Sequence, residues 1–456
     1  MTELFFELIR VAIGMQERLS RVPSKKEWGR LFKMAERQRL LGICFYGVKK
    51  VASPKYDNEA SPQYNNEAYP QYNNDDDNDY DPSATTIPGD LYDYWLGTAA
   101  LIQQQNQKVN SQCVEVCNKL QEAGFKCSIL KGQGIAQLYN EGRKTKDESN
   151  FLGMFRQSGD IDVWVDGGMK KAMAWAKKEY GDVRFDYINA HLPMYKDTEV
   201  ELHWRVQSLD NLWKNKKLQR WLEEHKEELL NTTEVLPDGA GSIPVPSPTF
   251  NSFYILLHCY NHMFLEGLGL RQVMDYYFVL QSRRPTPTPS LHSEGNLETT
   301  LREFGMLKFA KAMMWVLMHV FECHNESLTP TPSPEGKGIY DNDKPTPNPS
   351  LKGRENLNWR ERYPWMIVEP DEKEGRFLLK ELMLNGNFGH FDKRVKKVSK
   401  NKRIQAIMNR VQHNFHLATH YPSEFFWPPI WLAYHYFWKR TVGIKVNRLS
   451  TSLIND

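Results

Sequence analysis

Two aspartates carry the pattern in this sequence that is best suited to chemistry. Asp160 and Asp162 lie in residues 158–165, where a turn glycine precedes alternating acidic and apolar residues. Because side chains i and i+2 project from the same face of a strand, both carboxylates are expected to point one way and the intervening apolar side chains into a core. Oxygen ligands without nearby cysteine or paired histidine suit Mg²⁺ or Mn²⁺. An acid-x-acid triplet alone is a weak signal, so the neighbouring elements have to support it.

An anion site is predicted upstream of the aspartates. Residues 128–130 are typical of a short buried strand that ends at Lys131-Gly132, and apolar residues then recur at helical spacing over 135–139. A glycine turn followed by a helix N-terminus presents backbone N–H groups to an anion. On this interpretation Gly132 lets phosphate oxygens approach the backbone and Lys131 supplies a positive charge. The alternative is a plain strand-to-helix turn with a surface lysine.

A third acidic side chain is expected to reach the aspartates from a later strand. Residues 199–206 alternate strictly between polar and apolar, which predicts a half-buried strand. An amphipathic helix over 169–176 and a hairpin with its turn at 196–198 are predicted before it. Glu201 is therefore a candidate third carboxylate. His203, on the same face, is either a substrate contact or a solvated strand residue.

These motifs, in this order, resemble those of the polymerase-β-type nucleotidyltransferase superfamily, and within it a bacterial nucleotidyltransferase family. The corresponding pieces here are Leu130-Lys131-Gly132, Arg156-Gln157-Ser158-Gly159-Asp160-Ile161-Asp162 and Glu201-Leu202-His203-Trp204. The resemblance extends downstream to His258, His262, Gly269-Leu270-Arg271 and Asp275. Residues 385–390 are similar to those of relatives from gut Bacteroidetes.

Two features depart from the family pattern. Lys131-Gly132 replaces the usual glycine-serine turn of the superfamily, and the loop over 140–155 is longer and more charged. The departure concerns the contacts to the triphosphate and leaves the carboxylates intact.

The resemblance implies a site that works with two Mg²⁺ ions, or Mn²⁺, and a nucleoside triphosphate (NTP). In such enzymes an aspartate pair and a third carboxylate, here Asp160, Asp162 and Glu201, hold the ions, which activate the attacking hydroxyl and stabilise the departing pyrophosphate. Lys131 with Gly132 is implied to hold phosphate, and His203 is a candidate nucleotide contact. Arg156 is a further phosphate candidate, with an exposed arginine in a local surface ion pair as the alternative.

Four residues of the second half keep more than one interpretation. His258 and His262 share a helix face at i, i+4, as zinc ligands do, but no third ligand accompanies them, which favours core or substrate-pocket histidines. Arg271 and Asp275 also lie four residues apart. An intrahelical ion pair is the simplest interpretation of that spacing, and a grip on the nucleotide or acceptor is the other.

Composition sets few limits on partners. The net charge of the 456-residue chain is only +3, so no polyanionic partner is required. The six cysteines include no Cys-x-x-Cys pair, and nothing marks an oxidising compartment. Cys113 and Cys117, one helical turn apart, are expected to be buried thiols. Residues 1–14 are too short and too charged for a signal or membrane segment, so we expect a cytoplasmic protein without a membrane span.

The chain is predicted to divide into four parts. Residues 1–52 show apolar stripes typical of helices, and residues 53–90 have the composition of a disordered acidic insertion. Residues 91–245, beginning with a helix over 91–123, are assigned to the nucleotidyltransferase core. Residues 246–445 are assigned to a helical domain. It contains Pro-rich insertions at about 283–298 and 327–356, where alternating prolines exclude a helix.

A basic run over 393–403 precedes a cluster of aromatic residues over 425–438. Such a combination could bind RNA or an acidic membrane. The favoured interpretation is a solvated helix face for the lysines and core for the aromatics, with Pro428-Pro429 setting a turn.

We therefore predict an α+β protein with a small mixed sheet, flanking helices and a C-terminal helical domain. The favoured function is transfer of a nucleoside monophosphate from an NTP to an unidentified small-molecule, protein or RNA acceptor. One alternative is a metal-dependent glycosyltransferase, whose Asp-x-Asp also grips a nucleotide diphosphate. The other is a non-catalytic nucleotide-binding or regulatory module. The sequence identifies neither the base, the acceptor nor the oligomeric state.

Overall fold

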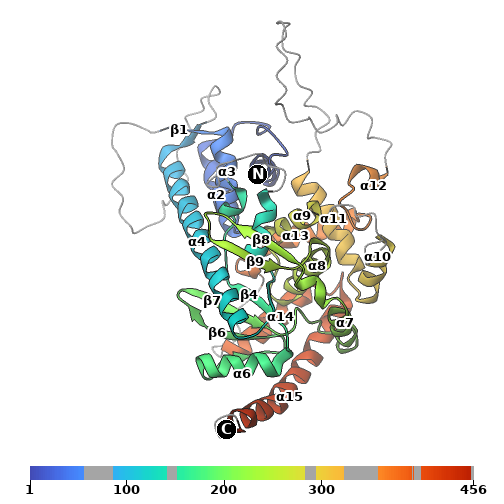
Figure 1. Ribbon diagram of the computed structural model, residues 1–456. Helices are drawn as coiled ribbons and strands as arrows, with labels where there is room; N and C mark the ends of the chain where they lie inside the picture. Colours follow the sequence, from blue (N-terminus) through green and yellow to red (C-terminus); the bar gives the residue numbers. More distant parts are fainter. Residues whose placement is uncertain are drawn as a thin grey trace.

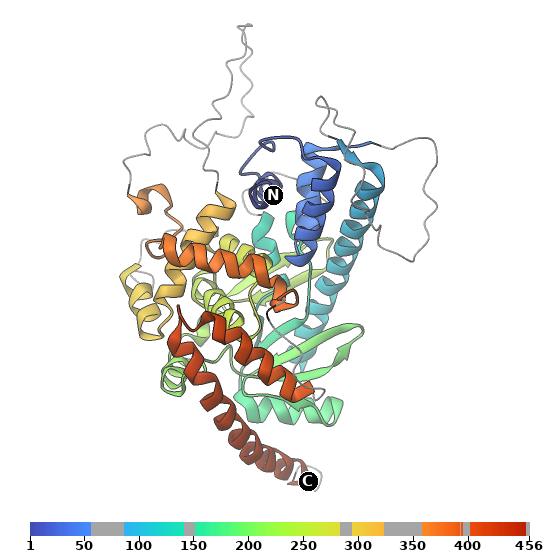
Figure 2. The same cartoon turned by 180° about the vertical axis from the view of Figure 1, so that it is seen from behind.

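The predicted α+β class is confirmed by a computed structural model of the chain (Figure 1). The structure describes residues 1–55, 86–140, 151–282, 294–322, 358–392, 394 and 402–452. A five-stranded mixed sheet lies between a long helix on one side and the helical second half of the chain on the other, and the view from behind shows the same arrangement (Figure 2). The site described below lies where the sheet meets the helical half.

The sheet has the strand order β3-β4-β7-β6-β5. Its strands are β3 (Cys127–Ile129), β4 (Ile161–Val165), β5 (Arg184–Phe185), β6 (Asn189–Tyr195) and β7 (Thr198–His203). β4 and β7 run parallel, and every other neighbouring pair of this sheet is antiparallel. A two-residue turn, Lys196-Asp197, joins β6 to β7, as the hairpin prediction requires.

The two faces of the sheet have different neighbours. On one face, Ile161, Val163 and Val165 pack in a core with residues of α4 (Gly89–Glu122) and α6 (Gly168–Tyr180). Because side chains alternate along a strand, Asp162 and Trp164 point to the opposite face, which the helical half covers. Both are buried there. The predicted division of β4 into apolar and acidic faces is therefore confirmed, although neither face is exposed.

The N-terminal part is helical, as predicted. It contains α1 (Thr2–Ile13), α2 (Lys25–Arg37) and α3 (Leu41–Val51), and α4 follows. Ser24 and Glu27 form a capping box that fixes the start of α2. Cys113 and Cys117 are both buried in α4, as expected.

The predicted disorder over residues 53–90 is wrong at both ends. β1 (Ser53–Lys55) pairs in parallel with β2 (Thr86–Pro88), and α4 begins at Gly89. Residues 56–85, which contain the repeats, lie outside the described residues. Composition located the low-complexity segment, but the pairing of its two flanks depends on strands far apart in the sequence.

Short elements complete the region around the sheet. They are α5 (Gln133–Ala136), η1 (Gln137–Asn140), η3 (Leu152–Phe155), α7 (Leu212–Glu224), η4 (Lys226–Leu229), β8 (Thr232–Leu236) and β9 (Gly241–Val245). β8 and β9 form a separate antiparallel hairpin whose Leu236, Ile243 and Val245 join the core under the sheet.

The second half is helical from Pro248 onward, as predicted. Its elements are α8 (Pro248–Leu265), α9 (Leu270–Gln281), α10 (Glu294–Glu303), α11 (Leu307–Phe321), α12 (Trp359–Arg362), α13 (Glu372–Asn385), η5 (Asn387–Gly389), α14 (Lys402–Leu417) and α15 (Pro422–Ser452). Ser247 caps α8 by accepting a hydrogen bond from Phe250 N. The predicted end of the first Pro-rich insertion, at about residue 298, is too far downstream, because α10 begins at Glu294. Residues 283–293 and 323–357 lie outside the described residues.

The C-terminal helix differs from its prediction in two ways. Pro428 and Pro429 lie inside α15 and set no turn. Phe426, Tyr436 and Phe437 are 67%, 61% and 65% exposed, so the aromatic residues are core only in part. Aromatic side chains surround this helix, and only one stripe of a helix can face its neighbours. In both views the end of α15 extends away from the rest of the molecule (Figures 1 and 2).

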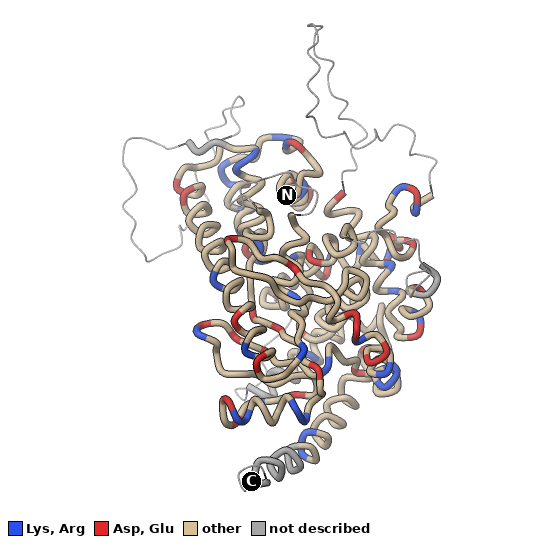
Figure 3. Tube along the Cα trace, in the orientation of Figure 1, with Lys and Arg blue, Asp and Glu red and all other residues tan. Residues whose placement is uncertain are grey.

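Charges on the described elements are mixed in sign (Figure 3). Of the basic run, Arg394 forms ion pairs with Glu381 and Asp392 at 2.7 and 2.9 Å. Residues 393 and 395–401 lie outside the described residues. Among the helices that the structure describes, none is both long and apolar enough to span a membrane.

Candidate active site

The register of the parallel strands β4 and β7 places two acidic residues side by side. Asp162 is the direct partner of Glu201, and their side chains project from the same face of the sheet. The sequence predicted only that Glu201 could come close to the aspartates, and the register shows which aspartate it lies beside. Two carboxylates from strands about forty residues apart therefore meet at one point of a partly buried surface.

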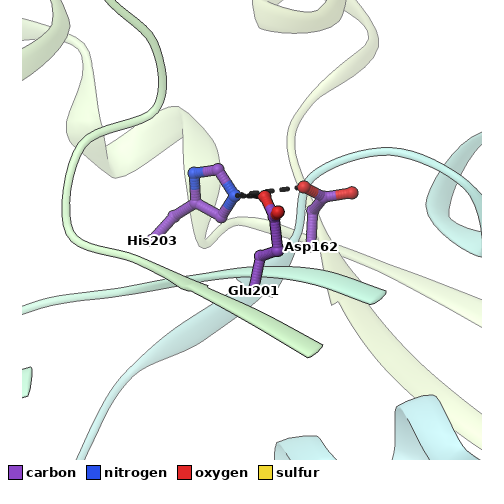
Figure 4. Close-up of side chains that lie close together, drawn as sticks. All are labelled: Asp162, Glu201 and His203. Carbon is purple, nitrogen blue, oxygen red and sulfur yellow. Dashed lines mark hydrogen bonds and ion pairs between the residues drawn. The ribbon is translucent and has the colours of Figure 1, made fainter. Parts of the chain in front are cut away.

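His203 connects the two carboxylates. Its Nε2 atom lies 3.0 Å from Asp162 Oδ1 and 3.3 Å from Glu201 Oε2, and Figure 4 shows the ring edge pointing toward both. Burial alone would lower the pKa of the His203 imidazole, but hydrogen bonds to Asp162 and Glu201 raise it to about 9. The side chain is buried, so the interpretation of His203 as a solvated strand residue is wrong.

Lys131 supplies a second cation at the same place. Its Nζ atom lies 3.0 Å from Asp162 Oδ2. Burial lowers the pKa of this amine, but the charges of Asp162 and Asp160 outweigh burial and raise it. The alternative of a surface lysine at a plain turn is therefore wrong, because Lys131 faces the acidic cluster.

Gly132 is a true turn residue, with φ of 61° and ψ of −112°, a conformation that favours glycine. The helix behind it differs from the prediction. α5 has only four residues and continues as a 3-10 turn. A one-turn helix provides little aligned dipole, so the backbone offers an anion less than the sequence suggested.

Asp160 lies just before β4, half-buried, on the wall of the cavity that also contains Asp162 and Glu201. The charge of Asp162 raises the pKa of the Asp160 carboxyl above its usual value. Ligand atoms of Asp162, Glu201 and His203 lie within 4.8 Å of one another, a spacing that could hold a metal ion. The structure thus brings two of the three predicted metal ligands into one cluster, with the third on the same wall.

The donor set fits a divalent cation. Asp162 Oδ2 is buried, and the ammonium of Lys131 lies 3.0 Å from it. Carboxylate oxygens are the ligands that Mg²⁺ and Mn²⁺ prefer, and a buried carboxylate is costly without a cation, a role that Lys131 fills in this structure. Asp162, Glu201 and His203 together therefore offer ligand atoms of the types and spacing that such an ion could use.

Arg156 has a partner that the sequence did not reveal. Its Nε and Nη2 atoms donate to the two carboxylate oxygens of Asp275 at 2.6 and 2.7 Å, and both side chains are buried. Tyr139 donates to the same carboxylate at 2.7 Å. The alternative of an exposed arginine in a local ion pair is therefore wrong, because Asp275 lies 119 residues away on α9.

The same contacts correct the simplest interpretation of Asp275, which was an intrahelical pair with Arg271. Among the described residues, Arg271 has no carboxylate at ion-pair distance, and its Nη1 donates to the Gln157 carbonyl at 2.9 Å. Asp275 instead fastens α9 to the segment that leads into β4. The predicted contact of Arg156 with phosphate stays a prediction.

The helical half forms the opposite wall of a cavity of about 460 Å³. Its side contributes Tyr254, His258, Asn261, His262, Arg271, Gln272 and Phe388. Burial, and then His262, lower the pKa of the buried His258, which is therefore neutral at physiological pH. His258 and His262 are thus pocket residues, one of the two interpretations favoured from sequence. A volume in this range accommodates a nucleotide-sized ligand.

Three residues around Glu201 were not predicted from the sequence: two contact its carboxylate, and the third contacts one of these two. Asn189 donates to Glu201 Oε2 at 2.6 Å, and His191 Nδ1 lies 3.1 Å from Oε1. Asp186 in turn lies 3.3 Å from His191. His191 is the antiparallel partner of Glu201, so alternation along 189–195 was the signal that could have found it.

Comparison with known families agrees with this geometry. A family model described as "Uncharacterised nucleotidyltransferase" matches residues 24–322, more than half of the chain. The chain belongs to this nucleotidyltransferase family. Neither a curated protein nor a solved structure matches it.

The nucleotidyltransferase match includes the sheet, the acidic cluster and the first helices of the helical wall. Lys131, Asp162, Glu201 and Arg271 all lie inside it, whereas Phe388 lies beyond it. The cavity lining therefore includes a residue that the family match does not reach.

Proposed function

We propose that the protein transfers a nucleoside monophosphate from an NTP to a hydroxyl or phosphate of a small-molecule, protein or RNA acceptor. Membership of a nucleotidyltransferase family supports the general activity. The observation that carries the proposal is the side-by-side placement of Asp162 and Glu201 at the wall of a nucleotide-sized cavity. A cytoplasmic, bacterial enzyme remains part of the proposal.

In this proposal Asp160, Asp162 and Glu201 hold divalent ions, Mg²⁺ or Mn²⁺. Such ions, when bound, neutralise the triphosphate and lower the pKa of the attacking hydroxyl. The bond between the α-phosphorus and the bridging oxygen breaks, a bond to the acceptor oxygen forms, and pyrophosphate and a proton leave. Phosphoryl transfer depends mainly on positioning and charge neutralisation, which fixed carboxylates supply.

The remaining residues have positioning roles. His203 and His191 fix the two oxygens of Glu201, so that its carboxylate is held in one orientation toward the cavity. We assign Lys131 and Gly132 to the phosphate side of the site, where Lys131 exchanges its contact with Asp162 for one with phosphate. Arg156 is assigned to holding α9 through Asp275.

The test is a screen of the purified protein with each labelled NTP and Mg²⁺ or Mn²⁺, which follows pyrophosphate release and labelling of protein or added acceptors. Asp162→Asn and Glu201→Gln should each reduce the rate by about a hundredfold or more, since each removes charge stabilisation of the transition state. Asp182→Asn is the matched control, because Asp182 is exposed and does not line the cavity.

Three outcomes separate the alternatives. Pyrophosphate release that needs both carboxylates supports the transferase. Release of sugar from a nucleotide sugar, without pyrophosphate from any NTP, would favour the glycosyltransferase. Binding of nucleotide with no turnover by the wild-type protein under any of these conditions would favour the non-catalytic module.

A further inference from the structure

Arg271 is a cation that projects into the cavity from the helical half. It occupies the second position of α9 and lines the cavity opposite the sheet. A Cβ atom added at Gly159 would lie 3.9 Å from Arg271 Nη1, so the guanidinium stands beside the backbone that carries Asp160. The arginine therefore lies next to the acidic cluster, although it comes from a different half of the chain.

Arg271 forms no direct ion pair within the described part of the chain, although the charges of Asp275 and Asp160 oppose the lowering of its pKa by burial. Its Nη1 donates to a backbone carbonyl, and its Nε atom is buried without a hydrogen-bond partner there. The nearest acid on the same helix, Asp275, is used by Arg156 and Tyr139. Burial, and then the charge of Arg156, lower the pKa of Arg271 to about 10, so it remains protonated at neutral pH. Arg271 is partly buried, and an anionic ligand that paired with it would offset the cost of removing its charge from water.

The guanidinium is held in place on two sides. The Gln157 carbonyl accepts from Nη1 at 2.9 Å, and the Phe388 ring centroid lies 5.8 Å from Cζ. Phe388 has a positive φ of 54°, which is rare for a non-glycine residue and marks a position that the surrounding structure imposes. Its neighbour Gly389 packs against Glu266, where a Cβ would lie 1.8 Å from the carbonyl oxygen. A fixed fork of N–H donors suits phosphate oxygens better than a mobile lysine does.

The sheet side of the cavity offers few groups of its own for binding the terminal phosphates. Lys131 already pairs with Asp162, and α5 is a single turn. We propose that Arg271 binds the terminal, β and γ, phosphates of the NTP whose α-phosphate lies at the acidic cluster. The assignment rests on the proposed function, and it makes the helical half responsible for distinguishing a triphosphate from a monophosphate.

The experiment compares ligands that differ in their phosphates. Calorimetric titrations with Mg²⁺ use inorganic tripolyphosphate, each NTP and the matching monophosphate, on the wild type, Arg271→Gln, Arg271→Lys and Arg205→Gln. Arg205 is the control, because it donates to the Tyr187 carbonyl and does not line the cavity. Melting curves without ligand check that each variant is folded. Should Arg271→Gln fail to fold, Arg271→Lys, which keeps the charge but loses the fork, supplies the answer.

Arg271→Gln should weaken tripolyphosphate and NTP binding by roughly ten- to a hundredfold, as for a lost charge-assisted hydrogen bond. Monophosphate binding should change less than about threefold. The lysine variant should fall between. Equal losses for NTP and monophosphate would place the arginine on the α-phosphate, which both ligands carry, and would overturn the proposal, as would unchanged NTP binding.

The two proposals fail in different ways. If Arg271→Gln loses tripolyphosphate binding while no NTP yields pyrophosphate with the wild type, the phosphate site stands and the transferase does not. If pyrophosphate release is lost when Asp162 is replaced, but the KM for NTP is unchanged in Arg271→Gln, the transferase activity is supported and the phosphate site at Arg271 is not.

Discussion

At the scale of single residues, the site is a set of buried charges that balance one another. Asp162 contacts both Lys131 and His203, and Glu201 contacts both His203 and His191. The pKa of each histidine is raised to about 9. For His203, burial lowers the pKa, but hydrogen bonds to the carboxylates of Asp162 and Glu201 outweigh it. For His191, hydrogen bonds to Asp186 and Glu201 raise the pKa. A change to one member of this set therefore alters the others.

Replacement of His203 tests this balance. His203→Ala should lower the free energy of unfolding by about 3 kcal/mol, because it removes one partner of a buried pair. Urea unfolding measures the loss. Added Mn²⁺ should then raise the melting temperature more in the variant than in the wild type, since the ion takes over the charge balance.

The opposite result is informative about the ligand set. A smaller rise in the variant than in the wild type would show that His203 itself ligates the ion, and the balancing role would be wrong. The wild type in the chelator EDTA sets the baseline for both proteins.

At the scale of elements, one buried ion pair joins the sheet to the helical half. Arg156 precedes β4 and Asp275 lies on α9, so the pair fixes the distance between the acidic cluster and the helix that carries Arg271. Burial would lower the pKa of the Arg156 guanidinium, but Asp275 raises it. The pair is thus held as two charges.

A double-mutant cycle measures this connection. Asp275→Leu alone should destabilise the fold by about 3 to 5 kcal/mol, because it leaves the buried Arg156 charge unpaired. Arg156→Met combined with Asp275→Leu should recover much of that loss, since no charge then stays unpaired. Thermal and urea unfolding of the four proteins give the coupling. Strictly additive losses would show that the two side chains act independently.

A second element-scale prediction concerns the turn that presents Phe388. Gly389 has φ of 64°, and a Cβ there would overlap the Glu266 carbonyl. Gly389→Ala should therefore cost about 3 kcal/mol or more and weaken NTP binding, because the overlap adds to the backbone strain. Gly14→Ala is the control. Gly14 has φ of 81° but open space around it, so only the backbone cost of about 1 to 2 kcal/mol applies. Similar losses in both variants would contradict the packing argument.

At the scale of the whole molecule, the sheet and the helical half enclose the cavity between them, so the site depends on how the two parts pack. Most of the described helices and strands outside α15 contribute side chains to the two cores. The alternating prolines within residues 323–357 come between α11 and α12 in the sequence and lie outside the described residues.

Replacement of residues 329–355 with ten glycine and serine residues should therefore leave the melting temperature within about 2 °C of the wild type, since loop length adds little closure entropy. NTP turnover should be unchanged. Loss of the cooperative melting transition in this variant would show that the replaced segment takes part in the fold.

Much of the architecture was decided by local pattern. The alternation of Asp160 to Val165 gave β4 its acidic and apolar sides, and the spacing in residues 1–52 and 91–123 gave the helices. Such periods of two and 3.6 residues depend only on near neighbours, because they follow from the geometry of strand and helix. The family resemblance was visible for the same reason, since its motifs are short and contiguous.

The sequence by itself thus determined the α+β class, the hairpin before Glu201 and the candidate acidic residues. Only the tertiary structure decided that Asp162 and Glu201 are in register, that His203 is buried between them, and that Asp275 pairs with Arg156 rather than Arg271. Those outcomes depend on which residues lose water together when distant segments pack. Loss of water sets the energy of a buried charge, and spacing along the chain does not encode it.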